Sequence, residues 1–597
     1  MERFFMVLIL RISLPFWITI FTASLMNDLY PIYTEEYNCQ DCYKCVRRCP
    51  VKAIRIEDNK ASVLPDYCIL CGTCVEVCPS EAKKMRNDVG RAKELLKNEL
   101  KVIASIAPSF VAEFGDIKVG QLIAGLKELG FYAVSETALG AEYVSEATAE
   151  YLEEQPSGVY ISSACPSVVE EVRKYHPELV SQIVPVKSPL LAHCELLKDR
   201  CGDDVVVVFI GPCIAKKLES DQHKDTLKAA ITFQDLKQWF DEEGVLPELL
   251  PDGMTFYPYS SVDGSVYPVD GGMNYGIKKF LKEDDVTFMS FSGSDNVSDV
   301  LQNVDQWELS DKVFLELLTC RGGCINGPGK STQQGIGIGN HRVIQYNKCA
   351  SLEDNGQKGG MNGKYNLSLS FSAHEQEQVV TPTEQEIFDV LETVGKYSIK
   401  DHLNCGGCGY NTCRNFAIAM LQGKAEQAMC VSYMRQQAQE KASALLQQIP
   451  AAVVVVNNHL KVVECNRKFA SLIGDEGEMI FEVKPRMEGS DIKKLFEHYQ
   501  LFEMLLQSGD EELQRDVTIN GNRLHVSLFT IQKKKIVGAI IQDLFDPIVK
   551  SDYVKNKAAD VIQRNMETVQ KIAFLLGENA SYTNSMLNSI TKSFEKE

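Results

Sequence analysis

One spacing of cysteines, repeated near the start of the chain, constrains the fold more than any other feature. The spacing C-x2-C-x2-C-x3-C-P occurs twice within residues 35–85. The first copy consists of Cys39, Cys42, Cys45 and Cys49, and the second of Cys68, Cys71, Cys74 and Cys78. Such short spacers bring several thiolates to one metal. Zinc ribbons also use paired C-x-x-C motifs and remain an alternative, but eight cysteines in a doubled pattern favour iron–sulfur clusters.

The doubled pattern resembles the bacterial two-cluster ferredoxins, in which the fourth cysteine of each copy binds the other cluster. The resemblance implies two 4Fe-4S clusters. Cluster one would be bound by Cys39, Cys42, Cys45 and Cys78, and cluster two by Cys68, Cys71, Cys74 and Cys49. We expect a two-cluster ferredoxin-type domain over residues 27–88, which transfers electrons.

Composition limits the remaining possibilities. A chain of 597 residues is long enough for several domains. The excess of 81 acidic over 62 basic residues, a net charge of −19, would repel a phosphate backbone, so we expect no nucleic acid partner. Clustered thiolates favour a reducing compartment, and we therefore expect a cytoplasmic protein.

Residues 1–26 form an apolar leader of doubtful status. The run is interrupted by Arg11 and Pro15. A membrane anchor, a signal peptide, and a leader upstream of a start at Met26 all remain open. We favour the start at Met26, because export would carry oxygen-sensitive clusters into an oxidising compartment.

The middle of the chain, residues 89–375, alternates apolar runs such as 205–210 with helical patterns such as 120–129, which predicts an α/β domain. Three loops in it carry cysteines. They read S-S-A-C-P at residues 162–166, G-P-C-I-A-K-K-L-E at 211–219 and E-L-L-T-C-R-G-G-C-I-N-G at 316–327. We expect the fold to bring these distant loops together as one ligand set. Alternatively, the cysteines of these loops are buried residues that only contribute to packing.

The three loops resemble the signature motifs of iron-only hydrogenases, T-S-C-C-P, M-P-C-x-x-K-x-x-E and E-x-M-x-C-x-x-G-C-x-x-G. The resemblance implies an H-cluster, which is a 4Fe-4S cluster joined to a di-iron subsite with carbon monoxide and cyanide ligands, installed by maturation proteins. Its ligands would be Cys165, Cys213, Cys320 and Cys324, with Cys324 bridging to the di-iron subsite. Lys216 would donate a hydrogen bond to one cyanide and Ser109 to the other.

Four positions depart from the family pattern. Ala164 replaces the cysteine that relays protons in the family, and a methyl group cannot carry a proton. General acid–base catalysis is typically worth about 10²–10⁴-fold in rate, so we expect low turnover. Gly211 and Leu318 stand where catalytic members have methionines, and Leu190 where a glutamine is expected. The ligands are kept while the proton path changes, which favours a sensor.

Two further features follow the middle domain's cysteines. The glycine-rich run at residues 335–339 lacks the surroundings of a nucleotide-binding loop, so we predict a return loop there. Residues 376–436 are expected to form a helical domain with a further 4Fe-4S cluster, and they resemble small cluster domains found beside sensory modules. The four cysteines of this domain are Cys405, Cys408, Cys413 and Cys430, and zinc remains the alternative.

The C-terminal part resembles a PAS domain over residues 437–546, with an Asn-Gly hairpin at 520–521 and Asn466 as a helix cap. Its ligand is unknown. Residues 547–597 show a heptad-like stripe, which predicts a signalling helix and a homodimer, or a helix packed on its own PAS domain. No histidine follows His525, so the output is expected to pass to a separate protein such as a kinase or phosphatase.

The expected fold is therefore multidomain, α/β and α+β. It comprises a ferredoxin-like domain, a hydrogenase catalytic-type domain, a small helical 4Fe-4S domain, a PAS domain and a C-terminal helix. The resemblance implies a hydrogen or redox sensor of an anaerobe that exchanges H2 and protons, with a ferredoxin as one possible redox partner. A ferredoxin-dependent hydrogenase that reduces two protons to H2 is the alternative, and a scaffold without metal is a third.

Overall fold

A computed structural model describes most of the chain between residues 30 and 543. The described residues are 30–99, 101–283, 285–307, 311–332, 334–353, 365–374, 382–519, 521–543, 561–563 and 566. They form two compact units, Met1–Leu391 with Tyr397–Glu426, and Glu392–Lys396 with Gln427–Glu597. The expected leader at residues 1–26 and nearly all of the expected C-terminal helix lie outside the described residues.

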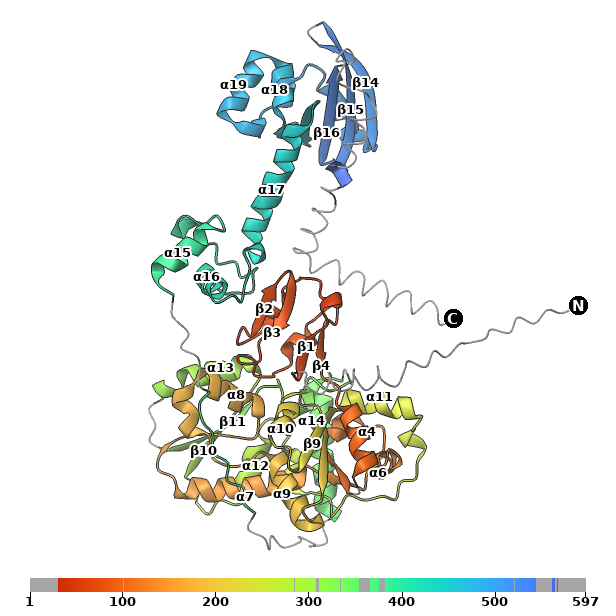
Figure 1. Ribbon diagram of the computed structural model, residues 1–597, viewed down its shortest axis with the longest axis vertical. Helices are drawn as coiled ribbons and strands as arrows, with labels where there is room; N and C mark the ends of the chain where they lie inside the picture. Colours follow the sequence, from red (N-terminus) through yellow and green to blue (C-terminus); the bar gives the residue numbers. More distant parts are fainter. Residues whose placement is uncertain are drawn as a thin grey trace, which may run out of the picture. The chain divides into compact units, whose positions relative to one another are not determined.

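The ferredoxin domain is built from two two-stranded antiparallel sheets and two short helices (Figure 1). Strand β1 (Ile32–Thr34) pairs antiparallel with β4 (Lys83–Met85), and β2 (Ile54–Glu57) pairs antiparallel with β3 (Lys60–Val63). Helices α2 (Lys44–Arg48) and α3 (Thr73–Glu76) each lie between cysteines of one motif copy. The doubled sequence thus folds as two similar halves.

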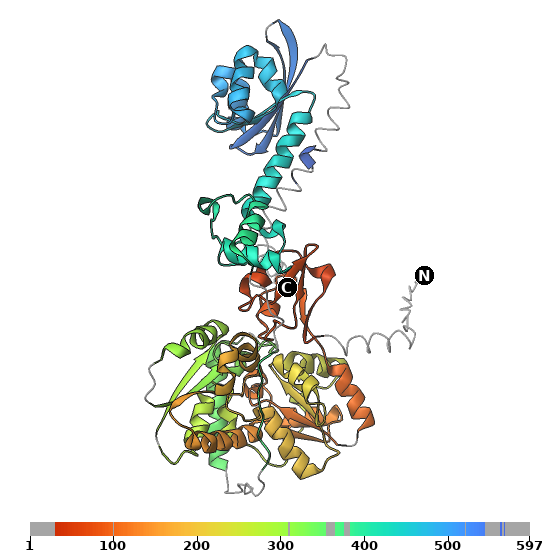
Figure 2. The same ribbon diagram turned by 60° about the vertical axis from the view of Figure 1, so that its left-hand side comes forward.

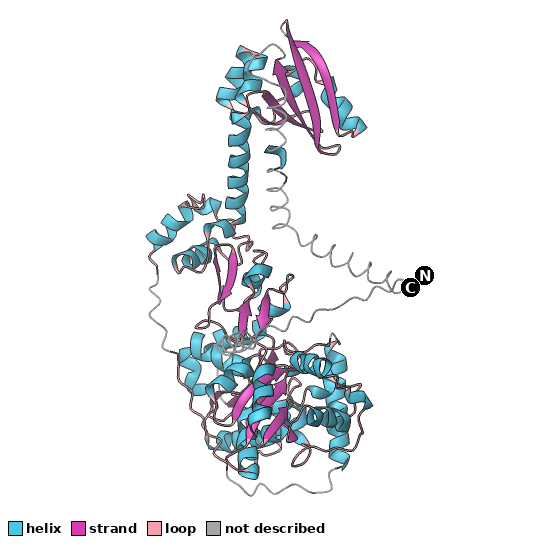
Figure 3. Cartoon of the chain, turned by 45° about the vertical axis from the view of Figure 1, so that its right-hand side comes forward, coloured by secondary structure: helices cyan, strands magenta, loops and turns pink. Residues whose placement is uncertain are grey.

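The middle domain contains two parallel sheets, seen in Figure 2 and as magenta strands surrounded by helices in Figure 3. The first sheet has the order β6-β5-β8-β9 and the second the order β10-β11-β7. The strands of the first sheet are β5 (Val102–Ile106), β6 (Ala133–Glu136), β8 (Val206–Gly211) and β9 (Leu227–Thr232). Those of the second are β7 (Gly158–Ile161), β10 (Val286–Ser292) and β11 (Lys312–Leu318). Parallel strands need helical crossovers, and burial on both faces explains their apolar runs.

Helices cover both sheets. They include α4 (Val89–Asn98), α6 (Val119–Glu128), α7 (Ala138–Glu154), α8 (Pro166–Tyr175), α9 (Pro189–Cys201), α10 (Ala215–Gln222), α11 (Phe233–Glu243), α12 (Gly272–Lys278), α13 (Ser294–Asn303) and α14 (Ile336–Glu353). The expected α/β architecture of this domain is confirmed. Among the described residues, none of the helices is long and apolar enough to cross a lipid bilayer.

The prediction of a return loop at residues 335–339 is wrong, because α14 begins at Ile336. One of the glycines, Gly339, allows close packing of this helix. A Cβ atom on Gly339 would lie 3.1 Å from Ile325 Cδ1 and 3.5 Å from Ala112 Cβ. With Val343 fully buried against the same two residues, the small side chain lets the helix approach the cysteine-bearing loop that contains Ile325.

The second unit joins a long helix to the PAS domain. Helix α17 (Val431–Gln448) begins directly after Cys430. The PAS sheet has the order β13-β12-β16-β15-β14. Its strands are β12 (Ala452–Asn457), β13 (Val462–Cys465), β14 (Glu512–Ile519), β15 (Asn522–Gln532) and β16 (Ile536–Asp543). All pairings in it are antiparallel.

Asn466 connects α17 to this sheet. Its Oδ1 accepts the N–H of Phe469 at 3.1 Å, which caps α18 (Arg467–Ile473) as expected, and also the N–H of Val453 at 2.9 Å. Its Nδ2 donates to the carbonyl of Leu446 in α17 at 3.2 Å. One buried amide therefore ties the end of α17 to the first strand and first helix of the PAS domain.

Candidate metal centre

A buried cavity of about 110 Å³ lies at the carboxyl ends of the strands of both parallel sheets. Ser109 follows β5, Cys213 follows β8, Cys165 follows β7 and Cys320 follows β11. The carboxyl ends of parallel strands are where open α/β sheets place their ligand sites. All three cysteine loops, which are far apart in sequence, reach this cavity, and Cys165, Cys213, Cys320 and Cys324 line it together.

Glycines shape the loop that carries two of these cysteines. Gly322 and Gly323 have φ angles of +76° and +93°, which side chains other than glycine rarely adopt. A Cβ atom on Gly323 would also lie 2.3 Å from the carbonyl oxygen of Pro268. The turn is therefore restricted to glycine, and it brings Cys320 and Cys324 to the same cavity.

For three of the four thiols, burial disfavours the charged thiolate. Burial raises the pKa of Cys213 to about 11, and raises those of Cys320 and Cys324 further above the ordinary thiol value. Neighbouring cysteines add to each shift, because thiolates placed together repel one another. A metal that binds here must supply the positive charge that deprotonates them.

Lys216 reaches the same cavity from α10. Its Nζ donates to Glu219 Oε2 at 2.7 Å and to Ser188 Oγ at 2.9 Å. An ammonium group has three protons, so these two bonds leave one for an acceptor in the cavity. Ser188, which caps α9 before Pro189, was not singled out from the sequence, although a serine before a proline is a common helix start.

Ser109 has a buried hydroxyl that the protein leaves without a hydrogen bond. The residue is 1% exposed, its Oγ has no partner, and it lines the cavity. An unpaired buried hydroxyl is unfavourable unless a ligand accepts its proton. Four thiols, one spare ammonium proton and one unpaired hydroxyl around a buried cavity fit a metal cluster that carries anionic ligands.

Three of the four departures from the hydrogenase motifs lie at this cavity, and the fourth lies next to a residue that lines it. Ala164, Leu190 and Leu318 line it directly. Position 211 has no room for a side chain, since a Cβ atom there would lie 2.5 Å from Phe209 Cζ. Phe209 itself lines the cavity, so its ring takes space that a side chain at position 211 would need.

Two lining residues were missed by the sequence reasoning. Met273 lines the cavity from α12 and lies 3.0 Å from Ser162 Oγ through its sulfur. Glu316 is 1% exposed, and burial raises its pKa to about 7, although the N–H groups of Asn274 and Gly271 donate to it and partly offset that rise. Met273 lies outside every motif, whereas Glu316 opens the third motif and could have been singled out.

The ferredoxin cysteines line two further cavities. One is lined by Cys39, Cys42, Cys45 and Cys78. The other is lined by Cys49, Cys68, Cys71 and Cys74. Each cavity thus gathers three cysteines of one motif copy and the fourth of the other.

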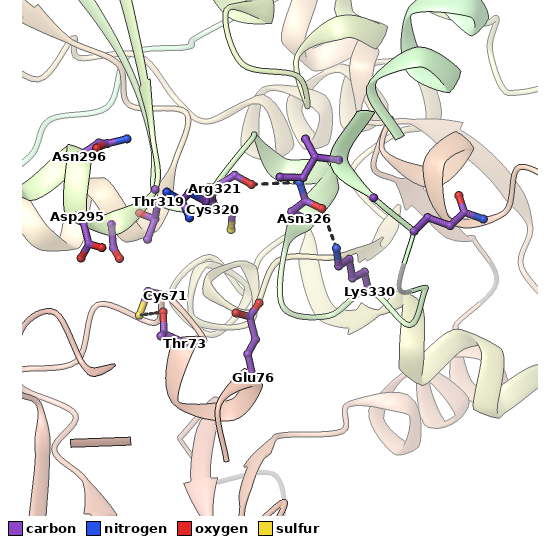
Figure 4. Close-up of a pocket in the computed structure, with 15 residues that line it drawn as sticks. Cys71, Thr73, Glu76, Asp295, Asn296, Thr319, Cys320, Arg321, Asn326 and Lys330 are labelled. Carbon is purple, nitrogen blue, oxygen red and sulfur yellow. Dashed lines mark hydrogen bonds between the residues drawn. The ribbon is translucent and has the colours of Figure 1, made fainter. Parts of the chain in front are cut away.

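The ferredoxin domain contacts the middle domain beside Cys71. A Cβ atom on Gly72 would lie 2.4 Å from Pro328 Cγ. Lys174 Nζ donates to the carbonyl of Cys68 at 2.8 Å. Cys71 lines the buried cavity and also a larger polar cavity of about 480 Å³, where Figure 4 shows it across from Cys320. Cysteines of the two domains are therefore neighbours.

The third cysteine group is described in two parts. Cys405, Cys408 and Cys413 belong to the first unit, where Cys413 begins α16 (Cys413–Leu421) and packs with Ile387 and Leu391 of α15 (Glu384–Glu392). Cys430 belongs to the second unit, directly before α17.

The cysteine-lined cavities define an iron–sulfur redox protein, and comparison with known families agrees. Residues 100–328 match the iron-only hydrogenase large subunit, C-terminal domain. Residues 31–79 match a 4Fe-4S dicluster domain, residues 401–432 an Fe-S cluster family, and residues 440–517 a PAS domain. The chain is an iron-only hydrogenase-like multidomain protein with a PAS domain.

Curated relatives are distant. The periplasmic Fe hydrogenase large subunit of Nitratidesulfovibrio vulgaris is 26% identical, over 52% of this chain and 88% of its own length. Iron hydrogenase 1 of Clostridium pasteurianum is 25% identical, over 42% of this chain and only 54% of its own length. Among solved structures, a variant of the HydA1 FeFe-hydrogenase from Chlamydomonas reinhardtii covers 48% of this chain and 99% of its own, with 20% identity and a TM-score of 0.37.

Proposed function

We propose that this protein senses hydrogen or redox state with a low-turnover hydrogenase site and passes the signal through its PAS domain. The observation that carries the proposal is the buried cavity, which keeps four cysteines, Lys216 and the unpaired Ser109 hydroxyl, but has Ala164 at the proton-relay position. Retained ligands with an altered proton path suit detection better than rapid catalysis.

The residues of the cavity would divide the work of holding an H-cluster. Cys165, Cys213, Cys320 and Cys324 would bind its iron, with Cys324 reaching the di-iron subsite. The H-cluster, when bound, supplies heterolytic cleavage of H2 to two protons and two electrons. Lys216 and Ser109 would each donate a hydrogen bond to a cyanide, and the apolar side chains of the lining would exclude bulk water.

Proton transfer is where this chain differs from a catalyst. The Ala164 methyl group cannot accept a proton from the di-iron subsite. Loss of a positioned acid–base group typically lowers rates by about 10²–10⁴-fold. We therefore propose that the site responds to H2 while turning over slowly.

Electrons would leave through the ferredoxin clusters and alter the third cluster, bound by Cys405, Cys408, Cys413 and Cys430. Cys430 directly precedes α17, and Asn466 ties the end of α17 to the PAS domain. This continuity supports α17 as the element that passes cluster state to the PAS domain. We further propose that the protein is a cytoplasmic homodimer and that its signalling partner is a kinase or phosphatase. Maturation proteins would build the H-cluster.

A ferredoxin-dependent hydrogenase is the second candidate, and Glu316 favours it. A carboxyl group with a pKa of about 7 that lines the cavity is poised to exchange protons at neutral pH. If Glu316 replaces the missing relay, the protein is a catalyst and its PAS domain is ancillary.

Hydrogen–deuterium exchange under H2 distinguishes the two. Matured, oxygen-free protein is compared under H2 and under argon, while H2 production from a reduced ferredoxin is measured in parallel. The sensor predicts slow production and altered exchange in α17 under H2. Rapid production with unchanged exchange in α17 would establish the catalyst instead.

A further inference from the structure

The loop that carries Cys405, Cys408 and Cys413 packs directly on the ferredoxin domain, at the helix α2 within its first cysteine motif. Gly409 makes the closest approach. A Cβ atom on Gly409 would lie 2.8 Å from Val46 Cγ1 and 3.2 Å from the backbone nitrogen of Arg47. Val46 and Arg47 belong to α2, between Cys45 and Cys49.

Polar contacts fix this packing on a second side. The N–H of Ile56 in β2 donates to the carbonyl of Lys424 at 3.1 Å. The N–H of Asp58 donates to Glu426 Oε1 at 2.8 Å. Lys424 Nζ lies 3.7 Å from the ring centroid of Tyr67. Two hydrogen bonds from the β2–β3 hairpin and a cation–π contact with Tyr67 thus add to the contact with α2.

Side-chain hydrogen bonds also join the two segments at the end of α2. Lys52 donates to the carbonyls of Val46 and Arg47, each at 3.2 Å. Arg47 Nη1 in turn donates to the carbonyl of Gly407 at 3.5 Å. The backbone before Cys49 is therefore connected to the loop between Cys405 and Cys408.

We propose that the contact between α2 and the 405–413 loop is an electron-transfer junction through which the third cluster exchanges single electrons with the ferredoxin clusters, on the Cys49 side. This inference rests on the clusters of the proposed function. Each transfer oxidises a reduced ferredoxin cluster by one electron and reduces the third cluster by one, with no other reactant.

The junction makes the ferredoxin domain a branch point. Cys71 lines the hydrogenase-like cavity, whereas Cys49, in the same cysteine set, directly follows α2, on which the loop of the third group packs. Electrons released in the cavity would then reach the third cluster through the ferredoxin domain, and an external electron donor to that domain would reach both.

Gly409→Leu tests the junction, because its side chain would push the loop away from α2. Gly406→Ala is the matched control, since Gly406 lies in the same loop with a φ of +68° but a Cβ there would meet only Tyr410 O at 4.0 Å. Reconstituted protein, with iron counted in each variant, is reduced with dithionite and examined by electron paramagnetic resonance for magnetic coupling between the third cluster and a ferredoxin cluster.

We expect coupling in the wild type and in Gly406→Ala, and its loss in Gly409→Leu. If Gly409→Leu loses iron, the double variant Lys424→Ala/Glu426→Ala loosens the same interface without touching a cysteine loop, and should weaken the coupling. Absence of coupling in a fully loaded wild type, or full coupling in an iron-replete interface variant, would overturn the junction. Infrared bands of the H-cluster are unaffected by either result, so failure here is distinct from failure of the proposed function.

Discussion

Restoring a thiol at position 164 is expected to convert the protein into a faster hydrogenase. The loop that holds this residue is already fixed, since the Ala164 N–H donates to Ser162 Oγ at 3.2 Å and Ser163 Oγ donates to the carbonyl of Val186 at 2.6 Å. Because Ala164 lines the cavity, a sulfur on its Cβ enters that space without a change of backbone.

The size of the gain follows from the lost proton transfer. A positioned acid–base group is worth about 10²–10⁴-fold, or about 3–5 kcal/mol of activation free energy. Matured wild type, Ala164→Cys and Ala164→Ser are compared by H2 production from a reduced electron donor. Serine fills nearly the same volume but is a poor acid, so only the cysteine variant should gain rate. Fast wild-type turnover, or no gain in an Ala164→Cys protein that carries an intact H-cluster, would refute the reasoning.

Three other substitutions probe the cavity wall. Lys216→Met should destabilise the metal-free protein by about 3–5 kcal/mol, because it leaves the Glu219 carboxylate buried without its cation. Adding Glu219→Gln should recover part of this loss in the free energy of unfolding, measured with denaturant. Equal stability of the single and double variants would contradict this. Gly211→Met should cost about 1–3 kcal/mol by overpacking against Phe209, and Phe209→Ala should relieve it; a fully stable single variant would refute the clash. Glu316 has a pKa of about 7 in the folded protein, against an ordinary value of 4.5. Between these pH values the folded protein keeps a proton on Glu316 that the unfolded chain releases. The free energy of unfolding therefore falls as the pH rises through this range. Glu316→Gln should therefore gain thermal stability relative to wild type from pH 5 to pH 8, and parallel pH profiles would show that Glu316 does not titrate there.

Local patterns predicted much of the fold. The apolar run at residues 205–210 corresponds to β8, and Asn466 caps α18 as its position before an apolar helix indicated. The prediction of a loop at residues 335–339 was wrong because glycine occurs both in turns and in closely packed helices. The contact of Gly339 with Ile325, which favours the helix, cannot be predicted from the local sequence.

The site was predicted where a motif carries the chemistry and missed where packing does. The resemblance of three loops to the motifs of a known family identified the four cavity cysteines as one candidate ligand set. The position of Met273, which reaches the cavity from α12, depends on contacts between segments that are distant in sequence. The packing of Gly409 on α2 joins residues more than 350 positions apart, and no local pattern encodes it.

Infrared spectroscopy of matured, oxygen-free wild-type protein tests the central claim most directly. An H-cluster held by Cys165, Cys213, Cys320 and Cys324 predicts carbon monoxide and cyanide bands that shift when H2 replaces argon. A protein that contains iron at all four of these cysteines and yet shows no such bands would contradict the account.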